Sequence, residues 1–154
     1  MANGPLTGLK VLDCTHVIAG AWCSLLLADL GADVIKIEPL EGETTRGHPK
    51  ARFKAFDYVN RNKRAIAVDM TTPAGAAVIK RLAKDADVFV ENYRPGALNR
   101  MGLGYEDIAK VNPRLVYASV SGFGLTGPYA DRGGFDLIAQ AMSGIMSFTG
   151  QPGD

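Results

Sequence analysis

The sequence has little of three things: cysteine, net charge and long apolar runs. Its 154 residues include two cysteines, Cys14 and Cys23, whose spacing matches neither a zinc site nor a redox motif. We expect both to be buried free thiols in a reducing, cytoplasmic compartment. The net charge of +1 gives no overall field that would attract nucleic acid or an anionic membrane, so neither is predicted as a partner.

Several sequence signatures are also absent. The first residues, M-A-N-G-P-L, lack the basic region and apolar core of a signal peptide, and no apolar run approaches the length of a membrane-spanning helix. The chain has no P-loop, no G-x-S-x-G elbow, no H-E-x-x-H and no zinc-ligand spacing. We therefore predict no metal site and no membrane association.

What is present is the composition of an ordinary folded domain. The apolar fraction is 47% and the charged fraction is 21%. A length of 154 residues suffices for one domain with a buried core. The final residues, F-T-G-Q-P-G-D, form a turn sequence that should lead into another element. We therefore expect residues 1–154 to be the amino-terminal part of a longer protein.

Strand-like and helix-like patterns alternate along the chain. Short apolar strands are predicted at Leu9–Asp13, Asp33–Ile37, Ala65–Asp69, Asp87–Val90 and Arg114–Val120. Helices are predicted at Ala19–Leu30, after Thr72-Pro73, at Tyr105–Lys110 and at Phe135–Ser147, with one helical turn near Phe53–Val59 in a long polar excursion. The alternation implies crossover connections, and hence an α/β fold with a Rossmann-like, doubly wound, mostly parallel sheet.

Local signals sharpen these predictions. Gly31 follows the first helix where a C-terminal glycine belongs, and Thr72 and Pro73 suit the N-cap and first position of the second. The first helix is apolar nearly all round and the fifth strand is continuously apolar, so we expect both to be buried.

The loop Glu91–Gly104 is the strongest candidate for a binding site. It follows the fourth strand, and in open α/β sheets ligands bind outside the carboxyl ends of the strands. Arg94 and Arg100 offer guanidinium groups that match phosphate geometry, in a loop made rigid by Pro95. The loop therefore predicts a site for a phosphate-bearing ligand. The alternative for Arg100 is that it caps a short helix.

The first strand-to-helix turn, T-H-V-I-A-G-A, carries half of a dinucleotide fingerprint. Only Gly20 of the expected glycines is present, although Glu38 stands where an acidic residue would hold a ribose hydroxyl. Binding of NAD is therefore disfavoured. The free amides at the start of the helix still suit another anionic ligand. His16 is either an acid/base group or a histidine that makes local hydrogen bonds.

Three further segments carry charged or glycine-rich signals, and the first of them leaves two alternatives open. The run Arg61–Arg64 forms either a solvated charged face or, with Arg46 and Arg52, a phosphate-binding surface. Asp136, in G-G-F-D, is predicted to cap the last helix. The glycine-rich stretch Ser121–Pro128 follows the fifth strand and suits a mobile loop near the ligand.

Together these segments resemble family III CoA-transferases, the CaiB/BaiF family, which includes formyl-CoA and carnitine CoA-transferases and α-methylacyl-CoA racemases. The resemblance covers essentially the whole chain, in order. The segments that carry it are L-T-G-L-K-V-L-D, L-A-D-L-G-A-D-V-I-K-I-E, N-R-N-K-R, A-D-V-F-V-E-N-Y-R-P-G, G-F-G-L-T-G-P and G-F-D-L-I-A-Q-A-x-S-G.

The resemblance implies that residues 1–154 form an amino-terminal, Rossmann-like domain that binds coenzyme A or acyl-CoA as substrate. It places CoA against Val17, Ile18, Ala19, Val68, Asp69, Met70, Thr71, Asn92, Tyr93, Arg94, Arg100, Gly133, Gly134, Phe135 and Asp136. Formyl-CoA transferase has a glutamine at the position of Ile18 and an arginine at that of Pro39. The loss of the glutamine argues against that exact substrate, and the contact made by the arginine is absent here or comes from elsewhere.

The resemblance also implies a reaction. Family members move CoA between carboxylic acids through aspartyl anhydride and aspartyl-CoA thioester intermediates. The nucleophilic aspartate is expected beyond Asp154, so this chain holds no catalytic residue and is inactive alone. An acyl-CoA and a carboxylic acid acceptor are the expected partners, and the expected assembly is an interlocked homodimer.

Two alternatives remain. Racemases of the family carry a histidine in G-H-D, where this chain has Phe135, which cannot exchange a proton. A racemase is therefore disfavoured. The second alternative is a CoA-binding module without catalysis.

Overall fold

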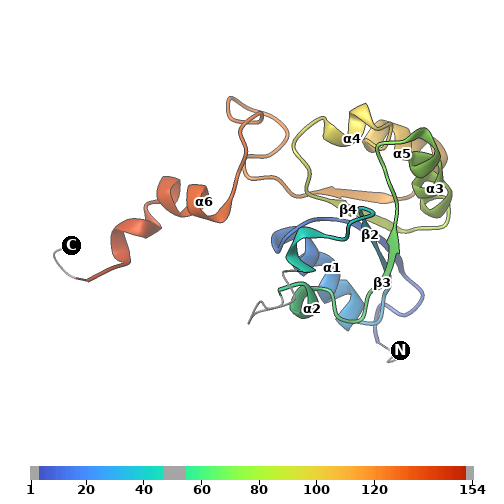
Figure 1. Ribbon diagram of the computed structural model, residues 1–154, viewed down its shortest axis with the longest axis horizontal. Coiled ribbons are helices and arrows are strands. Elements are labelled where there is room, and N and C mark those ends of the chain that lie inside the picture. Colours follow the sequence, from blue (N-terminus) through green and yellow to red (C-terminus); the bar gives the residue numbers. More distant parts are fainter. Residues whose placement is uncertain (1–3, 47–54, 152–154) are drawn as a thin grey trace. The chain divides into compact units, whose positions relative to one another are not determined.

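The computed structural model describes residues 4–46 and 55–151 (Figure 1). They fall into two compact units that meet in sequence between Val120 and Ser121. The helices of the first unit are α1 (Ala19–Asp29), the short 3-10 helix η1 (Thr44–Arg46), α2 (Ala55–Val59), α3 (Pro73–Ala83), α4 (Ala97–Arg100) and α5 (Tyr105–Val111). Its strands are β1 (Lys10–Cys14), β2 (Asp33–Glu38), β3 (Arg64–Ala67), β4 (Val88–Glu91) and β5 (Val116–Ser119).

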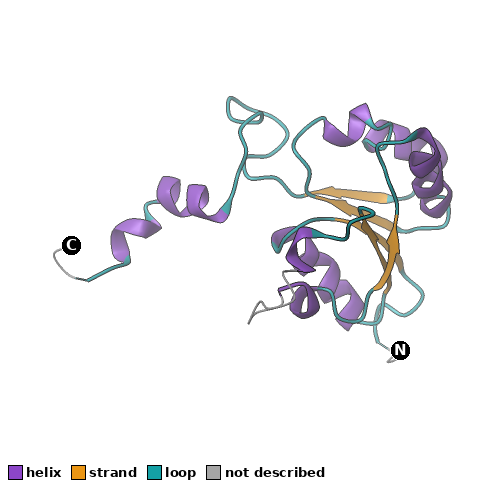
Figure 2. Cartoon of the chain, in the orientation of Figure 1, coloured by secondary structure: helices purple, strands orange, loops and turns teal. Residues whose placement is uncertain are grey.

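The first unit is a parallel sheet with helices on both faces (Figure 2). The strand order is β3-β2-β1-β4-β5, and each neighbouring pair is parallel. The order reverses direction at β1, which pairs with β2 on one side and β4 on the other. This confirms the predicted α/β doubly wound fold and puts a switch point beside β1.

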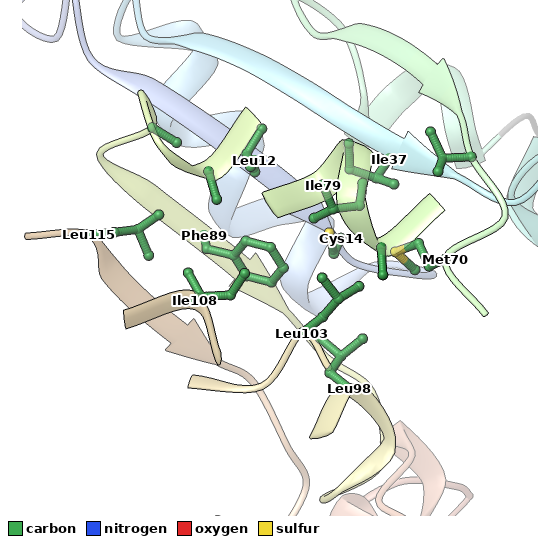
Figure 3. Packing of buried hydrophobic residues seen from close by; sticks show 14 residues of the cluster. Leu12, Cys14, Ile37, Met70, Ile79, Phe89, Leu98, Leu103, Ile108 and Leu115 are labelled. Carbon is green, nitrogen blue, oxygen red and sulfur yellow. The ribbon is translucent and has the colours of Figure 1, made fainter. Parts of the chain in front are cut away.

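Alternation along the strands builds a core on each face of the sheet. Val11, Val34 and Val90 form one cluster with Ala28 of α1 and with Ala32. The opposite face carries the larger cluster (Figure 3), which the sheet shares with α3, α4 and α5. Its labelled members are Leu12, Cys14, Ile37, Met70, Ile79, Phe89, Leu98, Leu103, Ile108 and Leu115. The period of two in each strand thus sorts neighbouring residues into different cores.

The predicted helix boundaries are confirmed where capping residues mark them. The Thr72 hydroxyl accepts a hydrogen bond from the Gly75 N–H at 3.1 Å, and Pro73 is the first residue of α3. Gly31 follows α1 with φ +100°, a left-handed conformation that glycine adopts without a steric penalty. The short helix α4, in contrast, has no strong sequence signal.

Three burial predictions, for the first helix, Cys23 and the fifth strand, were wrong. Helix α1 buries one face against the sheet and leaves Trp22 and Leu26 exposed on the other. Cys23 lies on that outer face and is exposed, whereas Cys14 is buried as expected. β5 is an edge strand and Val116 is 61% exposed, because within the first unit it has a neighbour on one side only.

The second unit contains α6 (Asp136–Ser143) and the 3-10 helix η2 (Ile145–Phe148). One continuous helix was predicted here, and Gly144 with φ +79° divides it. Asp136 is not the N-cap that was predicted. It is the first residue of α6, and its carboxylate accepts a hydrogen bond from the Gln140 amide. Across both units, the helices that the structure describes are too short or too polar to cross a membrane.

Candidate functional site

A cleft of about 350 Å³ lies at the carboxyl edge of the sheet. It is lined by His16, Pro39, Leu40, Glu41, Val68, Asp69, Met70, Thr71, Tyr93 and Met101. These residues come from segments that follow β1, β2, β3 and β4. Parallel strands bring their carboxyl ends to one edge, and this is why segments so far apart in sequence share a cleft.

Five of the predicted CoA-binding residues line this cleft: Val68, Asp69, Met70, Thr71 and Tyr93. The Asp69 carboxylate accepts hydrogen bonds from the Thr71 N–H at 3.0 Å and from the Thr71 hydroxyl at 2.6 Å. These bonds lower the pKa of Asp69. The wall that follows β3 is therefore a tight, acidic turn with Val68 and Met70 buried behind it.

Sequence reasoning missed other lining residues. Leu40 and Glu41 follow β2, and Met101 follows α4. The signal that would have found the first two is their place just beyond the carboxyl end of a central strand. Pro39, which stands where formyl-CoA transferase has an arginine, also lines the cleft.

His16 and Tyr93 form one side of the cleft. Their rings meet edge to face, with centroids 4.6 Å apart. Burial, and then the charge of Lys36, lower the pKa of His16, so the imidazole is neutral at neutral pH. Burial, and to a smaller extent the nearby Glu91 carboxylate, raise the pKa of Tyr93. Both rings therefore offer neutral polar groups and apolar faces to a ligand.

The backbone of His16 is bound by a distant side chain. Its N–H donates to Asn92 Oδ1 at 2.7 Å, and its carbonyl accepts from Asn92 Nδ2 at 2.8 Å. The backbone of His16 is thus fixed by a residue 76 positions away, and whether its imidazole is an acid/base group or a local hydrogen-bonding group stays a prediction. The side-chain amide of Asn92 thus uses its oxygen and one of its N–H groups in this contact. The contact connects the turn after β1 to the loop after β4.

Arg94 and Arg100 are exposed on that same loop. Neither forms an ion pair within the part of the chain that the structure describes. Arg100 lies in the last turn of α4, the place that the capping alternative gave it, and its guanidinium reaches back toward Gly96. Both cations remain available to an anionic ligand.

Other basic residues are already paired. Arg61 pairs with Asp29, and Arg64 with Asp33 at 2.6 Å. Lys63 is buried and binds Asp13 at 2.9 Å. The exposed, surface-paired Arg61 and Arg64 agree with the solvated charged face, whereas the ion pairs of these three basic residues do not favour the phosphate surface.

The acidic residue of the dinucleotide fingerprint is occupied as well. Glu38 is bound through both oxygens by Arg46, at 2.6 Å each, and the guanidinium carbon lies 3.8 Å from the Phe56 ring centre. Glu38 is therefore not free for a ribose hydroxyl, and Arg46 is not free for phosphate. Arg52, the other arginine of that prediction, lies outside the described residues.

A buried polar network lies beneath the turn between β1 and α1. The fully buried Asp13 carboxylate accepts from Ser24 Oγ at 2.6 Å and Lys63 Nζ at 2.9 Å, and Lys36 Nζ lies 3.8 Å away. Burial alone would raise the pKa of Asp13, but Lys36 and Lys63 bring it below the ordinary value. Asp13 is therefore ionised and is the anionic centre of the network.

Acid should weaken this fold through Glu38 and Glu43. Bonds from Arg46 lower the pKa of Glu38. Burial opposes the shift at Glu43, but bonds from Thr45 and Val17 lower its pKa too. A carboxyl with a lower pKa in the folded state stabilises the fold above its unfolded pKa, and that stability is lost as pH falls through the folded value. We expect a melting temperature that is flat above about pH 5 and drops below about pH 4.

The measurement is thermal unfolding followed at a series of pH values. Glu38→Gln should flatten part of the acid slope because its side chain no longer titrates. An unchanged slope in that variant would contradict the assignment.

Several of the residues predicted to bind CoA do not line the cleft. Val17, Ile18 and Ala19 are exposed at the start of α1. Gly133, Gly134, Phe135 and Asp136 are exposed in the second unit. Within the described residues, no cluster of three or more His, Cys, Asp or Glu side chains has the geometry of a metal site.

The fold and the cleft define a doubly wound α/β domain with a cleft at the carboxyl edge of its sheet. The sequence matches CoA-transferase family III over residues 6–154, and the chain belongs to that family.

Relatives of established name agree with this assignment. The chain is 51% identical over 151 residues to the succinyl-CoA:glutarate CoA-transferase of Mus musculus, covering 95% of this chain and 35% of that protein. It is 47% identical over 154 residues to the acetyl-CoA:oxalate CoA-transferase of Acetobacter aceti, covering 97% and 40%. The chain thus spans well under half the length of these relatives.

Solved structures show the same fold. A CAIB/BAIF family protein from Brucella suis matches with a TM-score of 0.92 and 45% identity, over 99% of this chain and 43% of that one. A beta-ketoacyl-ACP reductase structure with 16% identity and a TM-score of 0.51 shares the fold alone. The second match is consistent with a Rossmann-like sheet and says nothing about ligand.

Proposed function

We propose that this chain is the CoA-holding domain, residues 1–154, of an acyl-CoA:carboxylate CoA-transferase. The observation that carries the proposal is the cleft at the switch point, lined by the segment after β3 and flanked by a loop with two exposed arginines. Family membership and the names of the relatives support the same activity. The whole enzyme is proposed to be a cytoplasmic, interlocked homodimer.

The proposed ligand follows the chemistry of the cleft wall. The adenine and ribose are placed against Val68, Asp69, Met70 and Thr71, where apolar side chains and acceptors meet. Asn92, Tyr93 and Arg94 run along the carrier, and Arg100 holds a phosphate. The thioester is placed beside Val17, Ile18 and Ala19, and the pantetheine end beside Gly133, Gly134, Phe135 and Asp136.

The proposed reaction is covalent, with the nucleophilic aspartate outside residues 1–154. The carboxylate attacks the thioester carbonyl, the C–S bond breaks and CoA leaves as a thiolate, which gives a mixed anhydride. The thiolate then attacks the aspartyl carbonyl and releases the donor acid. The acceptor carboxylate reverses these steps and leaves with the CoA. Each attack forms an oxyanion that needs fixed donors, and we assign these to backbone amides near Ala19 or in the loop Gly122–Gly127.

A racemase is the second candidate, and the side chain at position 135 disfavours it. Phe135 has no group that exchanges a proton, so a two-base mechanism lacks one partner. A CoA-binding module without catalysis is the third. Transfer of CoA from succinyl-CoA to a dicarboxylate by the complete protein would exclude it. Thermal protection by NAD and not by CoA would exclude all three.

Arg100 gives the sharpest test of the ligand. Replacing Arg100 with alanine should weaken CoA binding by about 1.5–3 kcal/mol, because a charge-assisted hydrogen bond to phosphate is lost. Titration calorimetry on the complete protein measures this change. Arg114→Ala is the matched control, since Arg114 is an exposed arginine at the amino end of β5, away from the cleft edge. Equal affinity in the Arg100 and Arg114 variants would remove Arg100 from the site.

A further inference from the structure

Two buried charged side chains, Asp13 and Lys36, bind the backbone of Thr15 in the turn between β1 and α1. The Thr15 N–H donates to Asp13 Oδ1 at 2.9 Å, and the Thr15 hydroxyl donates to the same oxygen at 2.5 Å. The Thr15 carbonyl accepts from Lys36 Nζ at 2.8 Å. Lys36 lies on β2 and its side chain is 1% exposed, so the contact is shielded from water.

The backbone groups of the next two residues, His16 and Val17, are also bound by side chains. Asn92 binds both the N–H and the carbonyl of His16. The Val17 N–H donates to Glu43 Oε1 at 3.0 Å. Glu43 is itself buried and accepts hydrogen bonds from Thr45, so its carboxylate has a fixed position. Side chains from four separate segments thus bind consecutive backbone groups from Thr15 N–H to Val17 N–H.

The backbone of Val17 has an unfavourable conformation that needs these contacts. Its φ is +60°, in the left-handed region that a β-branched residue rarely adopts. Such a conformation persists only where the surroundings fix it, and it is found preferentially at functional sites. The exposed residues Val17, Ile18 and Ala19 are also those proposed to meet the thioester.

We propose that Lys36 and Glu43 are positioning residues, which hold the Val17 turn in a strained shape that presents the amides at the start of α1 to the thioester carbonyl. This inference rests on the proposed CoA-transferase function and extends it to two residues outside the predicted CoA contacts. Neither side chain needs to touch the substrate. Each acts through one backbone group: Lys36 through the Thr15 carbonyl and Glu43 through the Val17 N–H.

Lys63 provides a matched control for Lys36. Both lysines have side chains that are 1% exposed, and both pair with Asp13. The other bonds of Lys63 go to Ala21 O, Ser24 Oγ and Asn60 Oδ1, and none goes to residues 15–17. A loss of buried charge is therefore common to both substitutions, whereas release of the turn is specific to Lys36.

The experiment compares Lys36→Met, Glu43→Ala and Lys63→Met in the complete protein. CoA transfer from succinyl-CoA to glutarate gives kcat, and calorimetry with adenosine 3′,5′-bisphosphate, which lacks the pantetheine and thioester, gives the affinity of the nucleotide end. We expect kcat to fall about a hundredfold in the Lys36 and Glu43 variants, the effect of misplacing a reacting group by about 1 Å. Affinity for the bisphosphate should stay unchanged, and Lys63→Met should keep its kcat.

A conservative variant adds a rescue. Lys36→Gln keeps an N–H donor for the Thr15 carbonyl without the charge, and most of kcat should return. Should Lys36→Met fail to fold, Glu43→Ala and Lys36→Gln decide, and wild-type kcat in Glu43→Ala overturns the proposal.

Other outcomes are equally decisive. A fall in kcat that is equal in the Lys36 and Lys63 variants and follows their melting temperatures would show a structural role only. Unsubstituted protein that neither binds CoA nor transfers it would refute the proposed function instead.

Discussion

Replacing Asp13 with alanine is expected to lower the free energy of unfolding by about 3–5 kcal/mol. The substitution leaves Lys36 and Lys63 buried without their shared carboxylate, and an uncompensated buried charge is costly. It also removes the acceptor of the Ser24 hydroxyl. Asp13→Asn keeps the shape of the side chain and loses its charge, so a large effect in that variant too would assign the cost to electrostatics.

Asp33→Ala is the matched control for Asp13. Asp33 also pairs with a basic residue, Arg64, but its side chain is 32% exposed and that of Arg64 is 60% exposed. Solvent screens such a pair, and its loss should cost no more than about 1 kcal/mol. Urea unfolding at neutral pH measures both variants. Similar losses for Asp13→Ala and Asp33→Ala would show that the buried network does not stabilise the fold as described.

Gly75→Ala is expected to destabilise the fold by about 3 kcal/mol, the upper end of the range for overpacking. A Cβ on Gly75 would lie 1.8 Å from the Asp69 carbonyl oxygen and 2.6 Å from its carbon, so backbone must move. Helix propensity alone predicts the opposite sign, because alanine is favoured over glycine within a helix by about 1 kcal/mol. The sign of the change therefore separates the two effects.

Gly75→Ala should also change the shape of the cleft. Asp69 lines the cleft beside Val68 and Met70, and α3 cannot keep its place against the sheet unless that segment shifts. We expect CoA affinity to fall together with stability in Gly75→Ala. Ala77→Gly, at an exposed position of α3, is the control: it should cost about 1 kcal/mol through propensity and leave CoA binding intact. A Gly75→Ala variant as stable as the parent would disprove the close contact.

Much of the fold could be predicted because local signals agreed with each other. Thr72 and Pro73 start α3, Gly31 ends α1, and the alternating strands and helices imply a parallel sheet. Burial was harder to predict, because it depends on neighbours. Helix α1 is apolar on all sides but packs only one side on the sheet, and so Cys23 was wrongly predicted to be buried.

The candidate site was likewise predictable only in part. The segment Val68–Thr71 and Tyr93 were placed by the family resemblance, and the structure brings them into one cleft. The ion pairs of Lys36, Lys63 and Arg46 could not be predicted, since each joins segments whose separation in sequence says nothing about their distance. A lysine within an apolar strand, such as Lys36 in D-V-I-K-I, was the one available hint of a buried charge.

The central position of β1 has a consequence for synthesis on the ribosome. One edge of β1 pairs with β2, about 23 residues later, but its other edge pairs Val11 with Val88, 77 residues further along the chain. At about 5–20 residues per second, that edge waits roughly 4–15 s for its partner. During this interval Val11 and Leu12 belong to a half-built sheet with an open, apolar edge. The central strand of the sheet is therefore fully paired only after β4 has been synthesised, although it is the first strand in the sequence.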